Sequence, residues 1–213
     1  MRRPRKLVEL ATVAAFVAAV SAVTALVRVG LISIGTLAAT PRRIADGELW
    51  LLFSSASVVD RPIVASLVSL AALASVALLV CGSRVLWLAA LLGHTCSTIL
   101  AYLGLAALQT LDPGSFNAAL GAPDYGVSAI SAAWLGAIAT TAWISRCSAP
   151  SQKAAVAFAC AGVALFAWML RGDLTVLDSE HVFAFALGAG VAGRSVLGTV
   201  RRSESTMRTH GAG

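Results

Sequence analysis

Charged residues are scarce in this chain, making up 12% of its 213 residues, against about 25% in an ordinary soluble domain. Hydrophobic residues make up 58%, so too few polar side chains are present to cover a surface that faces water. This shortage excludes an ordinary soluble globular domain and indicates a surface that faces lipid. Because a helical span takes about 20 mostly apolar residues, the chain has room for about six spans and no second domain.

Cysteine is also sparse. The four cysteines show no Cys-x-x-Cys spacing and lie in or beside apolar runs: Cys81, Cys96, Cys147 and Cys160. This pattern indicates neither a disulfide framework nor a metal site, and we expect no cofactor. The net charge of +6 comes from Lys and Arg residues between the apolar runs. We interpret these residues as topology signals and lipid contacts, and we expect no nucleic-acid partner.

Six apolar segments dominate residues 7–200. They lie at about 7–27, 63–82, 85–104, 126–145, 154–170 and 180–200. We predict an all-α fold, a polytopic bundle of six transmembrane helices, between a short N-terminal segment (1–6) and a disordered tail (201–213). The first segment follows a basic start but has no small-residue cleavage site, which favours an uncleaved span over a signal peptide. The sixth contains Arg194, which can snorkel to the interface.

The basic residues also predict the orientation. With the N-terminus inside, most Lys and Arg residues between the apolar segments fall on the cytoplasmic side, and most acidic residues fall on the other. The positive-inside rule therefore predicts a multi-pass protein of the cell membrane with both termini in the cytoplasm. Two long connections, residues 28–62 and 105–125, then face outward. The first mixes apolar and charged residues, so we expect it to lie at the interface.

Two polar residues, Ser128 and His181, mark the outer ends of the fourth and sixth segments. Even-numbered spans begin on the outer side in this topology, so the two residues share a depth. A serine hydroxyl needs an adjacent base to become a nucleophile, and histidine is the usual one. Small residues follow each on a helical face: Ala132 and Gly136 after Ser128, Ala184 and Gly188 after His181. Such stripes allow close helix packing, which would bring Ser128 and His181 together.

Each of these features also has an ordinary structural explanation. A serine in a membrane helix often bonds the carbonyl one turn back, and small stripes serve packing alone. His94, in the third segment, fits either a proton path or a bonded core histidine. Three acidic residues also have two explanations. They could raise the pKa of His181, or they could belong to a solvated outer loop: Asp173, Asp178 and Glu180.

Three motifs, in order along residues 7–200, resemble those of the rhomboid intramembrane proteases. Gly47-Glu48-Leu49-Trp50-Leu51-Leu52-Phe53-Ser54-Ser55-Ala56 is similar to the Gly-Glu-x-Trp-Arg-Leu stretch that follows the family's first span. Gly126-Val127-Ser128-Ala129 resembles its Gly-x-Ser-Gly motif at the start of span four. His181, with Gly188 seven residues on, resembles the histidine and glycine-rich face of span six.

The resemblance implies a serine endopeptidase that cleaves membrane proteins in or near their transmembrane segments. Ser128 would be the nucleophile and His181 the general base, in a cavity that admits water. Backbone N–H groups around Gly126, Val127 and Ala129 would hold the oxyanion, and Gly126 would let the chain approach the substrate closely.

Departures from the family's pattern keep a second hypothesis open. Ala129 replaces the second motif glycine, Leu51 replaces an arginine, and Val58–Leu70 contains neither the histidine nor the asparagine that support the oxyanion in active members. The alternative is a proteolytically inactive rhomboid-like protein that binds transmembrane partners. A small transporter is a third hypothesis, but the chain lacks the paired intramembrane charges and internal repeats typical of one.

Overall fold

The computed structural model describes residues 3–59, 62–114, 116–144 and 176–210. These residues form an all-helical fold without strands, apart from one isolated bridge between Ala39 and Asp124, so the predicted all-α class is confirmed. The predicted segment 154–170 lies outside the described residues, as do Cys147, Cys160 and Asp173.

Long helices occupy the other five predicted segments. They are α1 (Arg3–Arg28), α5 (Ile63–Cys81), α6 (Ser83–Leu111), α8 (Ser128–Ile144) and α10 (Val176–His210). Three stretches, Lys6–Arg28, Ile63–Cys81 and Ser83–Leu111, are long and apolar enough to cross a membrane. Helix α8 is apolar but has only 17 residues. The described residues thus contain three candidate spans, and the six-span bundle stays a prediction.

Helix α10 differs from the prediction at its end. It continues to His210, so residues 201–210 are helical where we expected a disordered tail. The physical reason lies in the composition, because no glycine or proline interrupts the chain between Val200 and Gly211.

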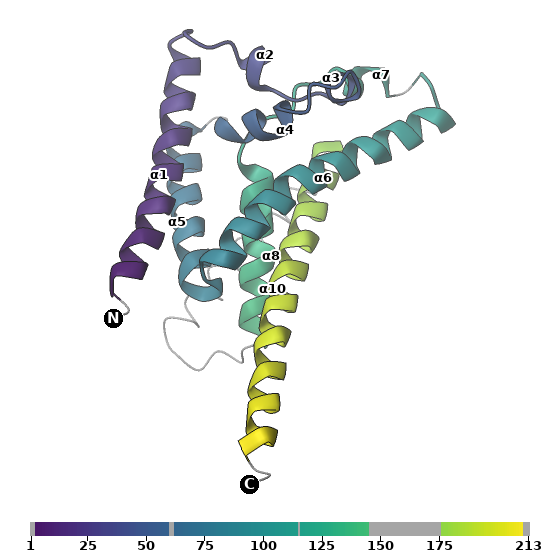
Figure 1. Ribbon diagram of the computed structural model, residues 1–213. Coiled ribbons are helices and arrows are strands. Elements are labelled where there is room, and N and C mark those ends of the chain that lie inside the picture. The colour runs from purple at the N-terminus through teal and green to yellow at the C-terminus, as the bar shows by residue number, and fades with distance from the viewer. Residues whose placement is uncertain (1–2, 60–61, 115, 145–175, 211–213) are drawn as a thin grey trace.

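Figure 1 shows how the long helices are arranged. Helices α1 and α5 run side by side, α10 lies along α8, and α6 crosses the bundle at a steep tilt. The first turns of α1 and the last turns of α10 lie at the same end of the molecule. At that end the Ser83 hydroxyl donates a hydrogen bond to the Glu9 carboxylate at 3.0 Å, which ties α1 to the start of α6.

Short helices cover the opposite end (Figure 1). They are α2 (Ile34–Leu37), α3 (Pro41–Ala45), α4 (Leu51–Ser54), the 3₁₀ turn η1 (Ser55–Ser57) and α7 (Asn117–Leu120). Thr40 caps α3 by accepting the Arg43 N–H at 3.1 Å. The Arg43 guanidinium then bonds the Glu48 carboxylate and the Ala38 carbonyl at 3.0 and 3.1 Å. One arginine therefore holds the segment between α1 and α4 in its folded path.

Helices α6, α8 and α10 meet at glycines. A Cβ atom on Gly136 would collide with the Phe185 carbonyl of α10, and one on Gly188 would collide with the Ala133 backbone of α8. A Cβ atom on Gly93 of α6 would likewise collide with the Ala133 side chain. Ala132 and Ala184 are both buried within these contacts. The small residues of α8 and α10 thus bring the two backbones into direct contact, as such residues do in membrane helices.

Candidate functional site

Ser128 is the first residue of α8, and its side chain is exposed. The turn before it contains Gly126, whose φ of +125° favours glycine. The Gly126 N–H donates a hydrogen bond to the Ser55 carbonyl at 2.8 Å, so this donor is already occupied. Val127 and Ala129 are buried on either side of the serine. The turn is therefore held by a backbone hydrogen bond and by buried side chains, while Ser128 itself is exposed.

The helical register places Ser128 beside the α8–α10 contact rather than on it. Ser128 lies eight residues before Gly136, which is about 80° around an α-helix. Ala129 and Ala132 lie within about 40° of the Gly136 direction, and both are buried. Among the described residues, none forms a hydrogen bond with the Ser128 hydroxyl.

His181 lies in the second turn of α10 and is partly buried. It is seven residues before Gly188, which is about 20° around the helix, so it lies on the face that packs against α8 and α6. Both helices run from the end that carries the short helices toward the other end (Figure 1). The structure thus brings the starts of α8 and α10 together.

A different serine and histidine are hydrogen-bonded in the structure. Ser55 Oγ of η1 and His94 Nε2 of α6 are 3.1 Å apart. Both side chains are buried, with exposed fractions of 1% and 5%. For His94, the bonded core histidine is therefore the alternative that the geometry favours. The sequence motif included Ser55, but nothing in the sequence indicated its partner 39 residues away.

Two more side chains of α6 form hydrogen bonds on the same side of the helix as His94. The Thr98 hydroxyl donates to the Glu180 carboxylate at 2.7 Å, and the Tyr102 hydroxyl donates to the Asp124 carboxylate at 3.0 Å. Glu180 is buried with an exposed fraction of 3%, so the structure favours an anchored carboxylate over a solvated loop acid. We call His94, Thr98 and Tyr102 the α6 polar face, because residues four apart share one side of a helix.

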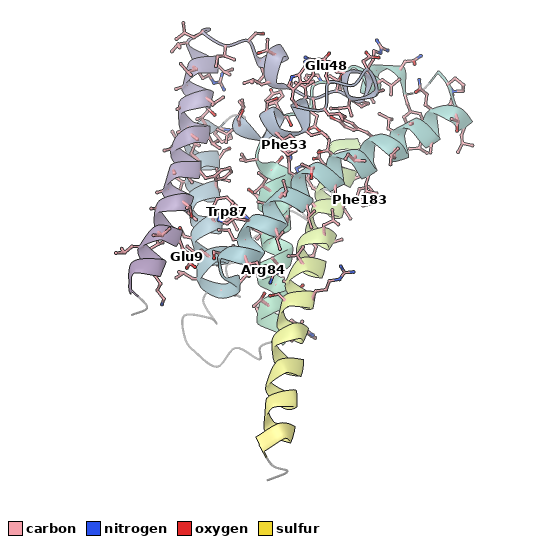
Figure 2. The ribbon with its side chains drawn as sticks, viewed as in Figure 1. Glu9, Glu48, Phe53, Arg84, Trp87 and Phe183 are labelled. Carbon is pink, nitrogen blue, oxygen red and sulfur yellow. The ribbon has the colours of Figure 1, made fainter. Side chains whose placement is uncertain are left out.

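A groove of about 200 Å³ lies next to His94. Its lining is almost entirely apolar and comes from α1, α4, η1, α6 and α8: Phe16, Phe53, Ala56, Trp87, Ala90, Leu91, His94, Thr95 and Ile130. Figure 2 shows Phe53 and Trp87 on neighbouring elements of this side of the bundle. Within the described ranges, no three His, Cys, Asp or Glu side chains are grouped as metal ligands would be.

No family model, curated protein or solved structure matches this chain. The likeness to rhomboid proteases therefore rests on the three sequence motifs. What the structure adds is the placement of those motifs: the Gly47–Ala56 segment, the Ser128 turn and the start of α10 all gather at the end of the bundle that carries the short helices (Figure 1).

Proposed function

We propose that the protein is a rhomboid-like intramembrane serine protease, with Ser128 as nucleophile and His181 as general base. The observation that carries this proposal is the direct contact between α8 and α10. Glycines on both helices let the two backbones come into direct contact. Each helix carries one member of the pair near the same end. Ser128 is exposed, as a nucleophile that meets a large substrate must be.

The chemistry follows from those two groups. His181 removes the hydroxyl proton as Ser128 Oγ attacks the scissile carbonyl carbon, and it returns that proton to the departing amide nitrogen. Water then hydrolyses the acyl-enzyme, with His181 again accepting and returning a proton. The first N–H groups of a helix have no intrahelical acceptor, so those of Ser128 and Ala129 are the donors available to the oxyanion.

The proposal includes the setting of the site. Six spans in the cell membrane, with both termini in the cytoplasm, would put the short helices and the Ser128 turn on the outer side. The first turns of α1 and the last turns of α10 lie at the same end of the molecule (Figure 1), which supports an even number of membrane crossings. Substrates are then membrane proteins whose transmembrane segments reach the site from the bilayer.

The test uses the full-length protein in liposomes with a panel of transmembrane reporter substrates and a fluorophosphonate probe. We expect cleavage and probe labelling for the wild type, and neither for Ser128→Ala or His181→Ala. Ser75→Ala is the control, because its hydroxyl only bonds the Ala71 carbonyl of its own helix. Labelling and cleavage that persist in Ser128→Ala would overturn the assignment.

A proteolytically inactive rhomboid-like protein that binds transmembrane partners is the second candidate. Two observations favour it: the Gly126 N–H is occupied by the Ser55 carbonyl, and Ser128 lies to the side of the α10-facing surface. This candidate predicts no fluorophosphonate labelling of the wild type, but crosslinking of a transmembrane partner to a photoreactive residue at position 128.

A further inference from the structure

Through its polar face, helix α6 bonds segments that adjoin both members of the proposed dyad. His94, Thr98 and Tyr102 point from one side of this helix, and each forms a hydrogen bond with a different segment. None of the three is part of the proposed dyad. Because all three come from one helix, their partners are held in a fixed relation to one another.

Tyr102 holds the turn that leads to Ser128. Its hydroxyl donates to the Asp124 carboxylate at 3.0 Å, four residues before the serine. The Asp124 backbone also pairs with Ala39 in both directions, at 2.9 and 2.8 Å. Asp124 is therefore fixed both to α6 and to the segment of short helices.

His94 holds the same turn through Ser55. Its ring nitrogen bonds the Ser55 hydroxyl at 3.1 Å, and the Ser55 carbonyl accepts the Gly126 N–H at 2.8 Å. Gly126 comes two residues before Ser128 and has the positive φ that directs the chain into α8. The turn thus has two anchors, and both lead back to α6.

Thr98 holds the start of α10. Its hydroxyl donates to the Glu180 carboxylate at 2.7 Å, and the Ser97 hydroxyl approaches the same oxygen at 3.4 Å. Glu180 immediately precedes His181. A buried carboxylate requires hydrogen-bond partners, so these bonds fix where the first turns of α10 lie.

We infer that the α6 polar face positions Ser128 and His181 relative to each other. This inference rests on the proposed function. His94, Thr98 and Tyr102 are positioning residues that act through Ser55, Glu180 and Asp124 and do not touch the substrate. A displacement of about 1 Å in a catalytic group can cost about 100-fold in rate, so the loss of one such bond lowers kcat while substrate binding is retained.

The test compares Tyr102→Phe and Thr98→Val with Thr95→Val. Thr95 is the matched control, because it lies on the same helix and its hydroxyl bonds only its own helix and the adjacent Cys96 sulfur. We expect kcat for a transmembrane reporter to fall about 10-fold or more in the first two variants, with KM within about twofold. Thr98→Ser, which keeps the hydroxyl, restores kcat.

A second measurement does not need activity. Ser128→Cys, in a protein whose native cysteines are replaced by alanine, is labelled with a water-soluble maleimide. The labelling rate changes severalfold when Tyr102→Phe is added and stays constant with Thr95→Val. Variants that match Thr95→Val in both kcat and labelling rate would overturn the inference. A changed labelling rate in a protein that never cleaves or binds fluorophosphonate would retain the positioning but reject the protease.

Discussion

Two serine–histidine pairs among the described residues differ in contact and access. Ser55 and His94 are bonded at 3.1 Å but almost fully buried. Ser128 is exposed, and His181 lies across a helix contact that brings their backbones together. A short serine–histidine distance does not by itself identify a nucleophile, because a nucleophile must also be within reach of its substrate. A buried pair suits the anchoring of η1 to α6, whereas the proposed peptide hydrolysis needs a serine that a substrate can reach.

The largest expected effect is the loss of activity when the serine of each pair is replaced in turn. If the proposal holds, Ser128→Ala should abolish peptide cleavage, with a loss of about 10⁴-fold or more, because the proposed nucleophile is removed. Ser55→Ala should still be labelled by the fluorophosphonate, at a lowered rate, since Ser55 anchors the turn and is not the proposed nucleophile. Reporter cleavage and probe labelling of both variants, at matched folded concentration, are the measurements. If Ser55→Ala abolishes labelling and Ser128→Ala does not, the two pairs exchange roles.

The next effect concerns the contact that carries the proposed dyad. Gly188→Ala places a Cβ atom against the Ala133 backbone, and overpacking of this kind costs about 1–3 kcal/mol or more. Gly190→Ala is the control on the same helix, because a Cβ there meets no atom within 4 Å. Thermal unfolding in detergent should show a lower Tm for Gly188→Ala alone. Equal Tm values would mean that α8 and α10 do not pack as described.

The sequence predicted the helices better than the contacts between them. The apolar run that begins at Ile63 predicted α5 to within one residue, and the small residues Gly136 and Gly188 stood where α8 and α10 touch. Helix α6 extends past residue 104 to Leu111, because Leu105–Leu111 contains no helix breaker. The spacing of apolar residues along the chain predicts such local structure.

The bonds of the α6 polar face could not be predicted in the same way. The sequence indicated His94 as a polar residue within the third apolar segment and Glu180 as an acidic neighbour of His181, but their partners depend on how distant segments fold together. Thr98 and Glu180 are 82 residues apart, and Tyr102 and Asp124 are 22 apart. Spacing alone assigns no partner over such separations. It also could not show that Gly126 donates its N–H to Ser55, which depends on the path of the short helices.

A moderate effect tests the buried pair. Ser55→Ala removes the hydroxyl that bonds His94 Nε2 and leaves a buried ring nitrogen without this partner. Such a loss costs about 1–3 kcal/mol, so Tm should fall. Ser75→Ala, which removes a hydroxyl bonded to its own helix, should change Tm much less. Equal Tm values for the two variants would show that the Ser55–His94 bond does not anchor η1.

The smallest effect lies in the segment between α1 and α4. The Arg43 guanidinium bonds the Glu48 carboxylate and holds the pKa of that group below its ordinary value. A carboxyl whose pKa is lower in the folded state stabilises the fold above its unfolded pKa, and this contribution is lost as the pH falls through the folded pKa. Acidification below the ordinary glutamate range should therefore increase proteolytic cleavage between α1 and α4.

Glu48→Gln tests the origin of that pH dependence. The variant should be cleaved faster than the wild type at neutral pH, and the difference should vanish in acid, where the wild-type carboxyl is protonated. Asp46→Asn, which alters an exposed carboxyl of the same segment, should behave as the wild type does. A pH dependence that survives in Glu48→Gln would assign the acid sensitivity to another group.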